Sequence, residues 1–160
     1  MINSKHQAVI DYLVTCPAIQ NSPLFFNFIN AQDGTNQFLT VSNDEYTSTK
    51  YIDGSVQKIY TFTILTFKSV NDIEVIQIPG YQNENLSDME DVQALIDWIQ
   101  EQEEIHNYPD FGENCIVESI KTTTEEPNFD GIDEQVEPNL AVYSTSIQIS
   151  YLDISKQLWR

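Results

Sequence analysis

Residues 56–70 read VQKIYTFTILTFKSV, and the rest of the chain is organised around this segment. Its β-branched and aromatic side chains favour a pleated strand over a helix. Because side chains alternate along a strand, Tyr60, Phe62 and Ile64 fall on one face, and the opposite face begins with Thr61. We therefore predict a long strand whose apolar face is buried.

A second long strand is predicted over residues 140–152, LAVYSTSIQISYL, where the alternation is cleaner. Tyr143, Ile147, Ile149 and Tyr151 point one way, and serines and a glutamine point the other. Two half-buried strands of this length need neighbouring strands and a covering layer.

Two helices are predicted, each introduced by a capping box, in which side chains satisfy backbone N–H groups at the helix start. The box at residues 4–7 (SKHQ) precedes a helix over about residues 5–15, which stops ahead of Pro17. The box at residues 87–90 (SDME) precedes a helix that runs to about His106. The apolar side chains at helical spacing are Val9, Tyr12, Leu13 and Cys16 in the first helix, and Met89, Val92, Ile96 and Ile99 in the second.

A hairpin is predicted ahead of the first long strand. Residues 24–30 and 37–42 are short apolar runs on either side of Asp33-Gly34, a pair that favours a tight turn. The polar residues 43–50 that follow are predicted to form a loop.

Residues 115–122 are predicted to form a third long strand, with Ile116 and Ile120 on the same face. Residues 73–78 also look strand-like, but Pro79-Gly80 ends any strand there, and residues 81–86 read as loop.

The order of these elements predicts an α+β fold. We expect a mainly antiparallel sheet of about five strands with two helices packed on one face, in a single domain that spans residues 1–160.

The charge is strongly acidic, with 7 Lys and Arg against 25 Asp and Glu, a net charge of −18. Such a surface repels duplex DNA and anionic membranes, so we expect neither specific nucleic-acid binding nor membrane binding. No run approaches the roughly eighteen apolar residues of a membrane span, which predicts a soluble protein made in the cytoplasm. Cys16 and Cys115 are expected to be small, reduced thiols; the sequence leaves open whether they meet.

No catalytic constellation is recognisable in the sequence. His6 and His106 lie near opposite ends of the two predicted helices and have no nucleophile beside them in a motif, so an exposed or capping histidine is expected at each. We therefore expect no catalytic residue, no cofactor and no metal.

One spacing resembles a calcium loop. Glu126, Asn128, Asp130, Gly131 and Glu137 occupy its offsets 1, 3, 5, 6 and 12. Glutamate at the first offset, with a proline after it and strand-like segments on both sides, favours a solvated acidic loop over residues 125–138.

Several short motifs resemble the tail-completion proteins, also described as minor capsid or tail terminator proteins, of long-tailed phages and prophages of Gram-positive bacteria. They are YIDGS at residues 51–55 with Lys58 and the Tyr60/Phe62 alternation, IDWI at residues 96–99, NYPDFG at residues 107–112, and the closing strand from Tyr143 to Tyr151.

This resemblance implies an α+β subunit without enzymatic activity. Such subunits assemble as a ring, typically of six copies, that caps the tail tube and joins it to the head connector. The expected partners are then other copies of the chain and the tail-tube and head–tail connector proteins. The expected location is the head–tail junction of a virion assembled in the bacterial host cytoplasm.

Within such a ring, acidic side chains on the channel wall would let DNA pass without binding it. The acidic residues expected to face the channel or the adjoining rings are Glu101, Glu103, Glu104, Glu125, Glu126, Asp130, Asp133, Glu134 and Glu137. Leu158 and Trp159 are expected at the subunit interface, although packing within their own subunit is an equal alternative.

Two other interpretations stay open. One is another structural protein of the same virion, a head–tail connector or a tail-tube subunit. The other is a small metal- or ligand-binding domain that uses its carboxylates.

Overall fold

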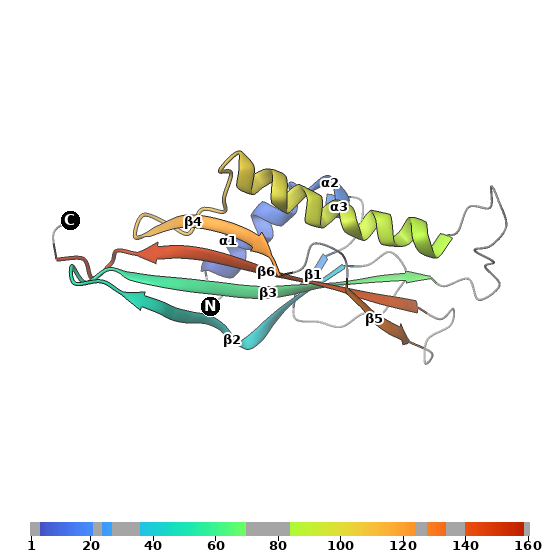
Figure 1. Ribbon diagram of the computed structural model, residues 1–160, viewed down its shortest axis with the longest axis horizontal. Coiled ribbons are helices and arrows are strands. Elements are labelled where there is room, and N and C mark those ends of the chain that lie inside the picture. Colours follow the sequence, from blue (N-terminus) through green and yellow to red (C-terminus); the bar gives the residue numbers. More distant parts are fainter. Residues whose placement is uncertain are drawn as a thin grey trace.

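The computed structural model describes residues 4–20, 24–26, 36–69, 84–123, 128–133 and 140–158, and places helices on one side of a long twisted sheet (Figure 1). The helices are α1 (Ser4–Leu13), α2 (Pro17–Gln20) and α3 (Glu84–Glu104). The strands are β1 (Leu24–Phe26), β2 (Asn36–Lys50), β3 (Val56–Ser69), β4 (Cys115–Thr122), β5 (Asn128–Asp133) and β6 (Leu140–Asp153).

The sheet is built on four antiparallel strands in the order β2-β3-β6-β4, with β1 beside β2 and β5 beside β6. The α+β class and the mainly antiparallel sheet are confirmed, whereas the expected count of about five strands is not matched. The two long predicted strands are neighbours at the centre, because β3 and β6 pair without interruption from Val56↔Asp153 to Ser69↔Leu140.

The predicted faces of these central strands are confirmed. Tyr60, Phe62 and Ile64 of β3 have no exposed surface, and Ile147 and Ile149 lie beside them on β6. The helices cover this face (Figure 1). Burying each such side chain contributes about 1.5–3 kcal/mol, so this layer is the main source of the fold's stability.

The helix layer agrees with the predicted apolar stripes and differs at the helix ends. Val9 and Leu13 of α1 and Ile96 and Ile99 of α3 are buried, as predicted. Residues 17–20, which follow the predicted end of the first helix, form the short helix α2, with proline at the first helical position where its missing N–H costs nothing.

The start of α3 differs from the prediction. The helix begins at Glu84, ahead of the predicted capping box, so residues 84–86 are helical and not loop. Ser87 therefore lies inside the helix. The strand-like residues 73–78 lie outside the described part of the chain.

The predicted hairpin is wrong. β1 pairs with β2 in parallel, with Leu24 opposite Asn36, and a tight turn joins only antiparallel strands. The predicted loop over residues 43–50 is also wrong, because these residues are the second half of β2 and pair with β3 as far as Lys50↔Val56. Hydrogen bonding to β3 holds this polar segment extended, which its composition does not indicate.

A β-bulge between Val117 and Ser119 corrects the predicted face of β4. The extra residue reverses the alternation, so Ile116 is 51% exposed while Ile120 is 1% exposed. The predicted acidic loop also contains a strand, since residues 128–133 form β5 against β6. Three positions of the calcium-like spacing, Asn128, Asp130 and Gly131, thus belong to strand β5.

Candidate functional site

The turn between β2 and β3 and the segment after β6 meet at one end of the sheet (Figure 1). We call residues 50–55 and 154–158 together the tip. The turn closes through hydrogen bonds from the Tyr51 N–H to the Ser55 carbonyl at 2.9 Å and from the Gly54 N–H to the Tyr51 carbonyl at 3.1 Å. Gly54 has φ of 90°, a conformation in which glycine is favoured.

Asp53 joins the two halves of the tip. Its carboxylate accepts hydrogen bonds from Gln157 Nε2 at 2.8 Å and from Ser55 Oγ at 2.6 Å, and its carbonyl accepts one from the Leu158 N–H at 2.7 Å. The hydrogen bonds from Gln157 first, and then from Ser55, lower the pKa of Asp53 to about 2. The carboxylate is therefore charged at neutral pH and fixed in place.

Large apolar side chains lie in water on this fixed backbone. Ile52 is 98% exposed and Leu158 is 69% exposed, and Tyr51 is also exposed. Tyr51 and Ile52 line a hollow of about 380 Å³ with Leu152, and Leu152 lies opposite the exposed Ile116. Four of the six large hydrophobic side chains exposed in the described residues are thus at or beside the tip. Such clustering is typical of a contact surface.

The tip also carries positive charge in a protein of strongly negative charge. Lys50, Lys58 and Lys156 line one small cleft of about 240 Å³. Lys58 Nζ is paired with Asp153 Oδ2 at 3.2 Å. Burial raises the pKa of Asp153, but hydrogen bonds from Ser155 and the contact with Lys58 outweigh it and hold that pKa at about 2. Within the described part of the chain, Lys50 and Lys156 have no ion-pair partner.

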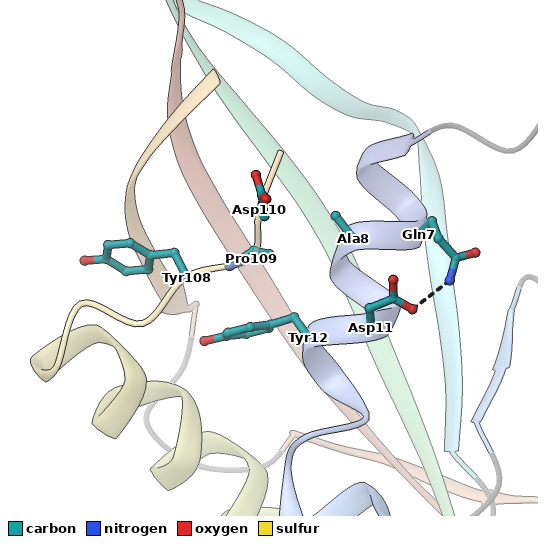
Figure 2. A pocket seen from close by; sticks show the side chains of 7 residues that line it. All are labelled: Gln7, Ala8, Asp11, Tyr12, Tyr108, Pro109 and Asp110. Atoms are coloured by element: carbon teal, nitrogen blue, oxygen red, sulfur yellow. Dashed lines mark hydrogen bonds between the residues drawn. The ribbon is translucent and has the colours of Figure 1, made fainter. Parts of the chain in front are cut away.

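A second hollow, of about 680 Å³, lies between α1 and the loop after α3 (Figure 2). We call it the acidic groove. Asp11 stands on its helix wall and Asp110 on its loop wall, and the rings of Tyr12 and Tyr108 point to the same side (Figure 2). The other residues that line it are Gln7, Ala8 and Pro109.

Each carboxylate of the acidic groove accepts one hydrogen bond from a neutral group. Asp11 Oδ1 accepts from Gln7 Nε2 at 2.8 Å, and Asp110 Oδ1 accepts from the Gly112 N–H at 2.9 Å. No described cation pairs with either carboxylate. The groove therefore presents two carboxylates, with Tyr12 and Tyr108 among its other lining residues.

Tyr12 of the acidic groove is fixed by contacts with the rest of the fold. The Tyr12 hydroxyl donates to the Asn107 carbonyl at 2.9 Å, and its ring packs against Trp98 with centroids 5.0 Å apart. Burial, followed by the nearby Cys16, Tyr108 and Glu103 groups, raises the pKa of Tyr12, which stays neutral. Burial and then Glu103 likewise raise the pKa of Tyr108.

The loop that carries Tyr108 starts from a defined end of α3. The Asn107 N–H bonds the Gln102 carbonyl at 3.0 Å and the His106 N–H bonds the Glu103 carbonyl at 3.2 Å, the two bonds of a Schellman motif. His106 takes φ of 56° at the position after the cap. His106 is exposed at the end of α3, in agreement with the predicted exposed or capping histidine, whereas His6 is only partly exposed and its ring hydrogen-bonds the hydroxyl of the buried Tyr60.

The predicted acidic residues separate into distinct groups. Glu101 and Glu104 are exposed on α3, as a partner-facing role requires. Glu103 is partly buried, and its Oε2 accepts the Ile120 N–H at 2.8 Å, so it binds the edge strand β4 of its own subunit. Asp130 and Asp133 belong to β5. Glu125, Glu126, Glu134 and Glu137 lie outside the described residues.

Of the two predicted interface residues, Leu158 is exposed at the tip and Trp159 lies outside the described residues. Sequence reasoning missed Ile52, the tip lysines and the acidic groove. The signal for the tip is present in Asp53-Gly54-Ser55, which is typical of a turn and would leave Ile52 outside the sheet. No sequence signal brings Asp11 close to Asp110.

The described residues contain no group of three or more His, Cys, Asp or Glu side chains placed to hold a metal ion. None of the helices in these same ranges is both long and apolar enough to cross a membrane. Cys16 is buried and Cys115 is partly buried, and no disulfide joins them.

No model of a known protein family matches the chain, and no curated protein matches it either.

Proposed function

We propose that this protein is a structural subunit of a long-tailed phage or prophage of Gram-positive bacteria, a tail-completion protein without catalytic activity. Copies of the chain form a ring at the head–tail junction, where the ring caps the tail tube and joins it to the head connector. The proposal combines the resemblance of the sequence motifs with the surface of the fold.

The observation that carries the proposal is the exposure of Ile52 and Leu158 on the tip. Asp53 holds both halves of the tip in position, so these side chains are displayed and not merely left loose. An apolar group fixed in water is unfavourable for a monomer and useful to a subunit whose neighbour covers it.

The charge of the chain supports the same function. A net charge of −18 repels DNA, which a channel that conducts a genome requires. Glu101 and Glu104 are the described and exposed members of the predicted channel set. We assign them to the channel wall or to an adjoining ring, and we assign Glu103 to the fold of its own subunit because it binds β4.

The test is electron microscopy of the purified protein at high concentration, together with its mass in solution. We expect closed single rings, and we expect Ile52→Ser to abolish them. Ile105→Ser is the matched control, because Ile105 is an equally large exposed side chain outside the tip. Extended tubes would identify a tail-tube subunit instead.

If the protein were a ligand-binding domain, the expected result would be different. A thermal-shift screen with calcium, magnesium and nucleotides would then raise the melting temperature by several degrees, since a ligand that binds only the folded state stabilises it. We expect no such shift. A shift together with turnover of a small molecule contradicts the structural function.

A further inference from the structure

The tip and the acidic groove are complementary in charge and share no residue. The tip presents Lys50 and Lys156 without ion-pair partners among the described residues. The groove presents Asp11 and Asp110, which no described cation neutralises. Two unlike surfaces of one molecule that complement each other favour head-to-tail contacts between copies, the kind that closes into rings.

We propose that the tip of one copy docks into the acidic groove of the next copy, with Lys50 and Lys156 facing Asp11 and Asp110. This contact rests on the proposed ring and defines how neighbouring subunits meet. The groove, of about 680 Å³, is large enough to receive side chains of a second copy. The tip can reach into it, because it projects beyond Val56↔Asp153, where the pairing of β3 with β6 ends.

The shapes of the side chains support a contact of this kind. Lysine stems are apolar and pack along aromatic rings while the ammonium group reaches a carboxylate. Tyr108, which is partly exposed and lines the groove together with Asp11 and Asp110, offers such an aromatic ring. Ile52 and Leu158, exposed on the tip, gain cover from the same contact.

Rigidity on both sides lowers the entropic cost of the contact. The tip is fixed by the Asp53 hydrogen bonds to Gln157 and Leu158. The groove is fixed by the bond from the Tyr12 hydroxyl to Asn107 and by the capped end of α3. Neither surface has to fold when the copies meet.

The test uses two charge-reversed forms of the full chain, Lys50→Glu with Lys156→Glu and Asp11→Lys with Asp110→Lys. Each form alone sets like charges against each other, and we expect its self-association to weaken by about tenfold or more. An equimolar mixture pairs every reversed tip with a reversed groove and every original tip with an original groove. We therefore expect association to return in the mixture, as measured by sedimentation velocity.

Lys121→Glu and Asp97→Lys serve as controls, because both residues are exposed and line neither surface. Asp11→Asn with Asp110→Asn gives a second, milder form in case reversal disturbs folding, which circular dichroism will detect. This form should weaken association by a smaller factor. Raising the salt concentration to about 0.5 M should weaken the wild-type association as well, because salt screens the attraction between the lysines and the carboxylates.

The outcomes distinguish this contact from the ring itself. Wild-type rings that both charge-reversed forms also build, or a mixture without recovery, overturn the contact and leave the ring standing. A wild-type protein that stays monomeric at hundreds of micromolar overturns both. Chemical cross-links from the groove to a different protein, in place of a second copy, also overturn the contact.

Discussion

The carboxylate of Asp53 accepts a hydrogen bond of 2.8 Å from the side-chain amide of Gln157, a residue 104 positions away in the chain. This bond ties the turn between β2 and β3 to the segment after β6. It orders a part of the chain that would otherwise fray.

We predict that this link is sensitive to acid. Asp53 has its pKa lowered from 3.8 to about 2, so its hydrogen bonds stabilise the fold above pH 4 and are lost as the pH falls toward 2. Asp53→Asn should remove this part of the pH dependence, while Asp97→Asn, at an exposed position of α3, should keep it. Urea denaturation between pH 2 and about pH 5 measures the difference, and identical curves for all three proteins would contradict the assignment.

Gly54 should tolerate no side chain. A Cβ there would lie 2.2 Å from the Lys156 carbonyl oxygen, and φ of 90° strains any other residue. Gly112 is the matched control, since its φ is 99° but a Cβ would meet nothing within 4 Å. We expect Gly112→Ala to cost about 1–3 kcal/mol from backbone strain, and Gly54→Ala to cost at least about 1 kcal/mol more. Equal losses in urea denaturation would show that Lys156 yields easily.

Glu103 should behave as a structural residue. Glu103→Ala leaves the Ile120 N–H without its acceptor and should cost about 1.5–3 kcal/mol, whereas Glu103→Gln keeps an acceptor oxygen and should cost less. Hydrogen exchange at the Ile120 amide provides the local measurement. An unchanged exchange rate of the Ile120 amide in the alanine variant would contradict a stabilising bond between Glu103 and β4.

Reversing the charge of Glu101 or Glu104 should stabilise the isolated subunit, in contrast to the loss of stability expected for Glu103→Ala. Both are exposed near the C-terminal end of α3, where the helix dipole disfavours anions. Glu101→Lys and Glu104→Lys should each stabilise the isolated subunit by about 0.3–1 kcal/mol, measured by thermal unfolding. If the two residues face the channel, the same variants should impair particle assembly or DNA ejection, and full function of both variants would remove them from the channel wall.

The residue after the α3 cap offers a paired comparison. His106 has φ of 56°, which glycine adopts freely and alanine does not. His106→Gly and His106→Ala both lose the contact of 3.1 Å between His106 Nδ1 and the Tyr108 hydroxyl. The glycine variant should therefore be more stable than the alanine variant by about 1 kcal/mol. The reverse order in urea denaturation would indicate that the loop relaxes to another conformation.

The long strands β3 and β6 and the apolar stripes of α1 and α3 were predictable because each repeats within a short stretch of sequence. Period-two alternation alone is enough to predict that Tyr60, Phe62 and Ile64 lie on the same, buried face of the strand. The parallel pairing of β1, the polar half of β2 and the bulge in β4 were not predictable in this way. Each depends on hydrogen bonds to a strand that is distant in the sequence.

The candidate surfaces follow the same division. The acidic charge and the buried faces of the central strands could be derived from the sequence alone, because composition and local periodicity encode them. The packing of the chain was needed to show that Gln157 closes the tip, that Asp11 and Asp110 line one groove, and that Glu103 binds β4. These relationships join segments far apart in the chain, and register and packing, not local sequence, bring such segments together.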